Sequence, residues 1–205
     1  MKKYILAIIF IAFAGSLHAQ HSSDPKHFLL ELEYGSTTSI NYSALSAFED
    51  NTISYTIPSA SFFFGFKIAD SKPYYGIFVE NSVAHTALYC KEKMSHINIL
   101  LSSRNHVHLF EHIDLWYGIG VGAALLKNDY VTGGEDKTIN RYGLSARFGG
   151  GIVYNINDFS FVGVSGGFEG TSFLGGDYDI PTGFQKNSNK VLIGSQIMLN
   201  WGVRF

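Results

Sequence analysis

Residues 191–205 have the sequence VLIGSQIMLNWGVRF, in which apolar and polar side chains alternate almost to the end of the chain. Gln196, Asn200 and Arg204 share the polar set of positions, and the other set is apolar. A period of two indicates a β-strand with one apolar and one polar face, and it does not fit an amphipathic helix. The apolar set comprises Val191, Ile193, Ile197, Leu199, Trp201, Val203 and Phe205.

The same alternation recurs in seven earlier segments. The chain contains 22 glycines and 4 prolines, and 15% of its residues are aromatic. Glycine weakens helix interiors, whereas aromatic and β-branched residues favour strands. We therefore predict an all-β fold with eight strands, the first seven at about 28–40, 59–70, 73–86, 93–109, 112–126, 141–156 and 159–172.

The predicted connections also alternate in length. Tight turns are expected at 71–72, 110–111 and 155–158, and longer loops at 41–58, 87–92, 127–140 and 173–189. Short turns at one end and long loops at the other are typical of a transmembrane barrel with both termini in the periplasm. The predicted fold class is a closed antiparallel up-and-down transmembrane β-barrel of eight strands.

The N-terminus has the pattern of a secretory signal peptide. Lys2 and Lys3 precede an uncharged apolar run over 4–14, which is too short to span a membrane as a helix, and a small-residue site ends at Ala19. We expect cleavage after Ala19, a barrel domain over 20–205 and an outer-membrane location. Cys90 is the single cysteine, so no intrachain disulfide is possible. A net charge of −2 without a basic run argues against nucleic-acid binding.

Charges indicate which face meets lipid. We assign nine charged residues to the polar positions of the predicted strands and none to the apolar positions. A charged side chain facing mid-bilayer lipid costs about 2–4 kcal/mol for Arg or Lys. The polar face is therefore predicted to line the lumen, where its charges form ion pairs that plug the barrel; a small gated ion path is the alternative. The nine are Glu31, Glu33, Lys67, Glu80, Arg104, Asp114, Arg147, Glu169 and Arg204.

Residues 28–205 resemble the small outer-membrane β-barrel family of the OmpA-transmembrane and OmpX type, most specifically in the terminal strand that ends on Phe205. The resemblance implies that Trp201, Val203 and Phe205 form the signal that the barrel-assembly machinery reads. We expect a monomer in outer-membrane lipid, with a structural or adhesive role and an extracellular ligand contacted through loops 41–58, 127–140 and 173–189.

Two other function classes remain open. A lipid A-modifying barrel enzyme would need a Ser–His arrangement near the outer leaflet, and His85 and Ser95, with Glu92 nearby, are the candidates. The His-x-Ser strand motif of lipid A deacylases does not occur within the barrel segments. A soluble lipocalin-like carrier also has alternating strands, but it would place the polar set in bulk water.

Four side chains form a possible metal-binding group at the predicted turn near residue 110. With a three-residue turn, His108 would lie opposite His112 and His106 opposite Asp114, all facing the lumen. Zinc binding is the weaker interpretation, because such spacing is common, and hydrogen-bonded or solvated histidines are expected. Acidic residues at 135–136 and 177–179 are expected to be solvated. No cofactor is predicted.

Overall fold

The computed structural model describes residues 26–39, 55–68, 72–86, 92–132, 134–176 and 191–205. The predicted signal peptide, Cys90, the acidic residues 177–179 and most of loops 41–58 and 173–189 lie outside these ranges.

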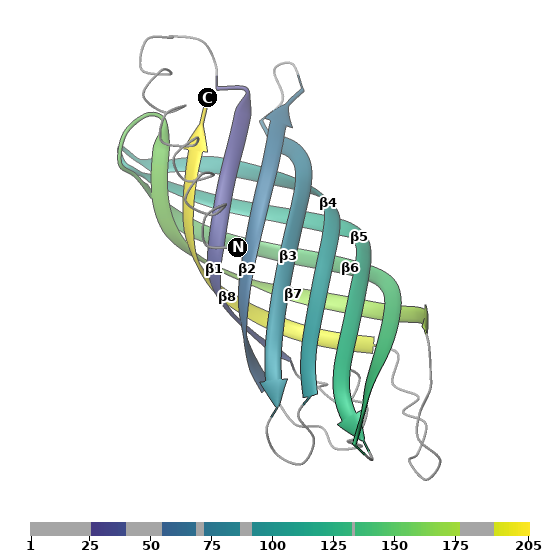
Figure 1. The fold of residues 1–205 in the computed structure, drawn as a ribbon. Helices are drawn as coiled ribbons and strands as arrows, with labels where there is room; N and C mark the ends of the chain where they lie inside the picture. The colour runs from purple at the N-terminus through teal and green to yellow at the C-terminus, as the bar shows by residue number, and fades with distance from the viewer. Residues whose placement is uncertain (1–25, 40–54, 69–71, 87–91, 133, 177–190) are drawn as a thin grey trace.

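Eight strands form one closed barrel in which each strand is antiparallel to the next (Figure 1). The long strands β4 to β7 lie on one side of the barrel and the shorter strands on the other. The predicted fold class is confirmed. The strands are β1 (Phe28–Ser39), β2 (Tyr55–Lys67), β3 (Tyr74–Thr86), β4 (Glu92–Phe110), β5 (Ile113–Thr132), β6 (Glu135–Asn155), β7 (Ser160–Gly176) and β8 (Val191–Arg204).

The first and last strands close the barrel. β1 pairs with β8 over eleven positions, from Leu29 opposite Arg204 to Ser39 opposite Gly194. At the end of this seam, the Phe28 amide donates to the Phe205 carbonyl at 2.7 Å, and the two rings stack with their centroids 5.7 Å apart. Closure leaves no unpaired strand edge along the barrel wall.

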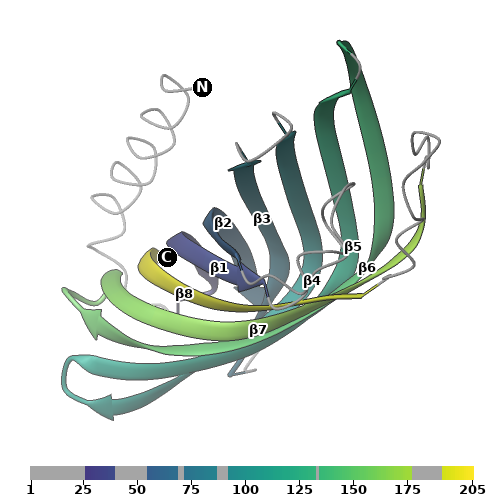
Figure 2. The same ribbon diagram turned by 90° about the horizontal axis from the view of Figure 1, so that it is seen from below.

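The predicted loop over 127–140 is wrong, because these residues form a β-hairpin. β5 and β6 stay paired from Lys127 opposite Asn140 to Thr132 opposite Glu135, and Gly134 adopts a φ of 83° in the connection. The hairpin projects past the neighbouring strands (Figure 2). Its residues are largely polar, so the apolar alternation that marks a strand is missing even though the backbone pairs fully.

Side chains alternate between an exposed outer face and a buried interior. The outer face carries a broad apolar surface, on which Leu101 is 72% and Ile197 69% exposed. The described residues include no helix that is long and apolar enough to cross a membrane. Inward glycines leave room for large rings: a Cβ built on Gly202 would lie 2.2 Å from the Phe161 ring, which is fully buried.

Candidate functional site

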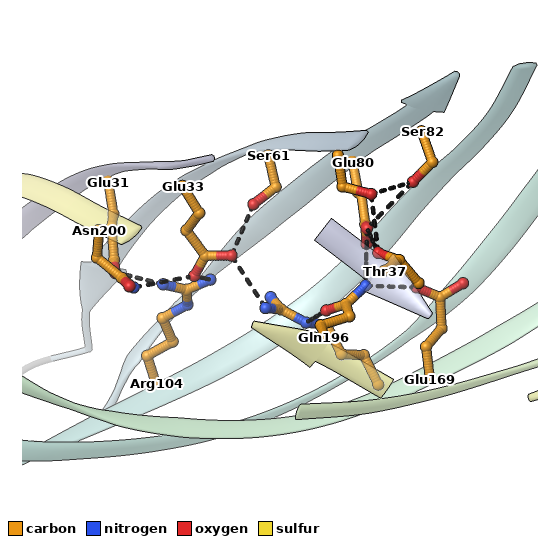
Figure 3. Close-up of polar contacts among 12 residues, drawn as sticks. Glu31, Glu33, Thr37, Ser61, Glu80, Ser82, Arg104, Glu169, Gln196 and Asn200 are labelled. Atoms are coloured by element: carbon orange, nitrogen blue, oxygen red, sulfur yellow. Dashed lines mark hydrogen bonds and ion pairs between the residues drawn. The ribbon is translucent and has the colours of Figure 1, made fainter. Parts of the chain in front are cut away.

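A chain of ion pairs crosses the interior of the barrel (Figure 3). Arg104 on β4 pairs with both Glu31 and Glu33 of β1, and its Nη2 lies 2.8 Å from Glu33 Oε1. Arg147 on β6 pairs with the other oxygen of Glu33 at 2.9 Å. Asn200 on β8 donates to Glu31 at 2.6 Å. The two arginine contacts join strands that are not neighbours in the barrel wall, whereas Asn200 and Glu31 lie on the paired strands β8 and β1.

Gln196 on β8 extends this chain toward the loop end. Its Oε1 accepts a hydrogen bond from Arg147 Nε at 2.9 Å, and its Nε2 lies 2.7 Å from Glu80 Oε1 and 3.0 Å from Glu169 Oε2. Asn98 on β4 donates to the other oxygen of Glu169 at 2.6 Å. A continuous series of polar contacts thus runs from Glu31 to Asn98, involving six strands.

Aromatic rings surround the two arginines. The Arg104 guanidinium carbon lies 4.5 Å from the ring centroids of Phe63 and Trp116, and that of Arg147 lies 4.2 Å from Phe78. The three rings belong to an apolar cluster with Leu29, Tyr74, Leu100, Val153 and Phe161. Cation–π contacts and ion pairs together compensate the arginines for the water that they lose.

A second apolar cluster lies farther toward the loop end, two inward-facing positions beyond Asn98, Glu169 and Gln196 on their strands. It consists of Ile57, Met94, Leu126, Phe173 and Leu192, all at most 6% exposed. The Glu80 and Glu169 region therefore lies between apolar layers, and each polar group there depends on a protein partner for its hydrogen bonds.

The nine predicted lumen charges all occupy inward-facing positions. Seven are at most 7% exposed, while Arg204 and Lys67 are partly buried at the turn end. Arg204 Nη2 lies 2.9 Å from Asp114 Oδ2, and the Lys67 ammonium lies 4.8 Å from the Tyr74 ring centroid.

The structure corrects the charge count in two places. Arg141 also points inward and is 4% exposed, and the count of nine omitted it. Lys93 lies on the outer face, opposite Asp129 of the neighbouring strand, so the apolar positions are not free of charge. Both residues lie in the loop-side halves of their strands. The network also contains neutral residues such as Asn98 and Gln196. In the sequence, the only sign of their role is that they occupy the same inward-facing set of strand positions as the charged residues.

The predicted arrangement of the histidines is wrong. The turn is shorter than assumed, with Phe110 opposite Ile113, and a register shift after His108 sets that residue opposite Asp114. His108 Nδ1 hydrogen-bonds to Asp114 Oδ1 at 2.9 Å, and the His112 ring packs against Tyr154. In the described part of the chain, no three His, Cys, Asp or Glu side chains are placed to hold a metal ion.

The candidate pair of His85 and Ser95 does not lie opposite each other on β3 and β4. His85 lies opposite Lys93, and Ser95 lies opposite Val83. The Ser95 hydroxyl donates to Asn81 Oδ1 at 3.3 Å. A serine nucleophile needs a base within hydrogen-bond reach, and Asn81 has no basic atom.

A cavity of about 560 Å³ opens at the turn end of the barrel. Residues before β1, in the turns and near the ends of six strands line it, including Lys26, Lys67, Lys72, His106 and Arg204. Burial lowers the pKa of Lys26, and the charges of Arg204 and Lys67 lower it further, against the opposing effect of the Asp158 carboxylate.

Neither a protein-family model nor a curated protein sequence matches this chain. Solved structures do match it. Neisserial surface protein A (NspA) aligns with a TM-score of 0.54 and 14% identity, over 87% of this chain and 97% of its own. Ail, the attachment invasion locus protein of Yersinia pestis, aligns with a TM-score of 0.54 and 13% identity, over 88% of this chain and 100% of its own. With its closed ring of eight antiparallel strands, the chain has the fold of the small outer-membrane β-barrels.

Proposed function

We propose that this protein is a non-catalytic outer-membrane barrel whose lumen is closed by side chains and which acts at the cell surface. The observation that carries the closed lumen is the series of contacts from Glu31 to Asn98, set between two apolar clusters. An eight-stranded barrel has an interior just wide enough for side chains to fill. Phe63, Phe78 and Trp116, each at most 1% exposed, occupy much of that space.

The exposed apolar face supports an outer-membrane location. Large apolar side chains such as Ile119, Phe148 and Leu199 are 58–64% exposed. An apolar surface of this extent needs lipid around it, because soluble monomers rarely expose large contiguous apolar patches. Outer-membrane lipid is therefore the partner of this face. Assembly would use the terminal strand, in which Trp201, Val203 and Phe205 form the signal for the barrel-assembly machinery.

The surface role is assigned to the loop end. There the β5–β6 hairpin exposes Lys127, Glu135 and Asp136, and Asp129 accepts a hydrogen bond from Thr138 at 2.7 Å that holds the two strands together. A polar hairpin whose strands are already paired suits binding, because a preordered segment loses little ordering entropy when a partner docks. Two barrels of the same fold are a surface protein and an attachment invasion locus protein. By analogy, we assign a structural or adhesive role to a monomeric barrel.

A hairpin exchange tests the surface role. Residues 127–140 would be replaced by a short Asn-Gly turn that closes β5 on β6, and intact cells would be assayed for binding to host proteins and to envelope lipids. The matched control is Lys72→Gln at the opposite end. The proposal predicts that binding is lost in the exchange variant and kept in the control. Equal binding by both variants would show that the hairpin is not the binding site.

Fractionation tests the location, and lipid analysis tests the absence of catalysis. The mature chain should begin at Gln20, fractionate with the outer membrane and show heat-modifiable migration, as closed barrels do. Recovery as a soluble periplasmic protein would contradict the proposal. Overexpression should leave the lipid A profile unchanged, and a deacylated or newly acylated lipid A would assign an enzyme instead.

A further inference from the structure

Several cationic and donor groups converge on the cavity at the turn end. Lys26, Lys67, Lys72 and Arg204 all line it, together with His106. Among the described residues, the Lys67 ammonium has no carboxylate within ion-pair distance, and it lies over the Tyr74 ring. Like charges gathered around a cavity are stabilised when an anion enters it.

His106 adds an unused donor to this cavity. Arg204 Nη2 donates to His106 Nδ1 at 3.1 Å, because a guanidinium can only donate. The proton of the neutral imidazole is therefore on Nε2. This Nε2 atom is buried and has no hydrogen-bond partner in the part of the chain that the structure describes. A buried donor without an acceptor is costly, so it favours an acceptor ligand.

The acidic residues of the cavity do not use these donors. Asp114 accepts from Arg204 and from His108, each at 2.9 Å. The Asp158 carbonyl accepts from the Lys26 ammonium. Glu111 is exposed in the β4–β5 turn. The ammonium of Lys67 and the Nε2–H of His106 therefore remain to bind a ligand.

We propose that this cavity binds a phosphate group, with Lys67 and His106 as its principal donors and Arg204 as a flanking charge. A tetrahedral phosphate presents several strong acceptor oxygens to donors on different strands, and charge-assisted hydrogen bonds to it are stronger than neutral ones. The phosphate has two possible sources: a soluble ion in the periplasm, or a phospholipid headgroup at the membrane surface. Only the assignment of this end to the periplasm rests on the proposed function.

Titration of the refolded full-length mature protein with inorganic phosphate tests the site. The protein would be held in zwitterionic detergent at constant ionic strength set with sodium chloride, and binding would be followed by the imidazole NMR signals of His106. Lys67→Gln should weaken binding about tenfold or more, since a hydrogen bond to a charged group contributes about 1.5–3 kcal/mol. Lys67→Arg should retain binding. The control is Lys93→Gln, which removes an exposed lysine at the loop end.

A parallel titration with phosphatidylglycerol in the same micelles separates the two sources. A response to inorganic phosphate that Lys67→Gln weakens supports the site with a soluble ligand. A response to the lipid alone, again weakened by Lys67→Gln, supports it with a headgroup ligand. No response to either probe, or a response that Lys67→Gln leaves unchanged, overturns the proposal. Neither result depends on the lumen being closed or on the surface role.

Discussion

Arg147 on β6 and Glu33 on β1 form an ion pair across the lumen, with Arg147 Nη2 2.9 Å from Glu33 Oε2. The two strands are not neighbours in the barrel, and both side chains are almost completely buried. The pair joins the arginine–glutamate half of the interior to the half organised by Gln196, because Arg147 also donates to Gln196.

Arg147→Ala is expected to destabilise the barrel by about 3–5 kcal/mol, because it leaves the Glu33 carboxylate buried with one partner fewer. The measurement is the free energy of unfolding in urea, with the protein folded into lipid vesicles. Lys93→Ala is the control and should change stability by no more than about 0.5 kcal/mol, since Lys93 is exposed. Equal effects of the two substitutions would show that the Arg147 pair is not a structural one.

Glu33 and Glu169 should respond differently to the same chemical change. Glu33 accepts from two arginines and from Ser61, whereas the hydrogen bonds to Glu169 come from neutral donors such as Asn98 and Gln196. Glu33→Gln should therefore cost about 3 kcal/mol or more. Glu169→Gln should cost less, about 1–2 kcal/mol, because no arginine loses its partner and a charge near Glu80 is removed, while the single amide oxygen can replace only one of the two carboxylate oxygens as an acceptor.

The same unfolding assay applied to both variants checks this order. If Glu169→Gln lowered the free energy of unfolding as much as Glu33→Gln, the negative charge of Glu169 would be essential to the stability of the interior. The distinction between an arginine-paired Glu33 and a Glu169 held by neutral donors would then be wrong.

Much of this organisation was predictable from the chain. The alternation at 113–125 and 191–205 predicts both that these segments are strands and which of their faces points inward. The lipid-facing side must avoid charge, so the charged set of positions is the inward one. The β5–β6 extension escaped prediction, since both of its faces are polar and only backbone pairing reveals it. The contact between Glu33 and Arg147 escaped too: sequence parity shows that two side chains face the lumen, but the registers of all intervening strands decide which of them meet.

Gly202→Ala is expected to destabilise the barrel by about 1–3 kcal/mol, because the new methyl group would overlap the buried Phe161 ring. Gly170→Ala is a matched control on the neighbouring strand, where a Cβ would meet no atom within 4 Å. Thermal unfolding followed by heat-modifiable migration measures both. A Gly202→Ala barrel as stable as the control would mean that Phe161 is free to move.

Cysteine scanning in a Cys90→Ser background tests the assignment of the two faces. Cysteines at Leu101 and Ile197 should react strongly with a lipid-phase probe, because these side chains are 72% and 69% exposed on the outer wall. Cysteines at Glu31, Glu80 and Arg104 should react weakly, because these positions face the interior. Strong lipid-phase labelling at several interior positions would show that the faces are reversed.

Planar-bilayer recording of the purified mature protein tests the closed lumen most directly. The proposed closed lumen, filled by the aromatic rings around Arg104 and the contacts from Glu31 to Asn98, predicts that the wild-type protein shows no stable, large conductance. Arg147→Ala should lose stability without gaining a selective current. A stable, porin-like conductance in the wild-type protein would contradict the closed lumen.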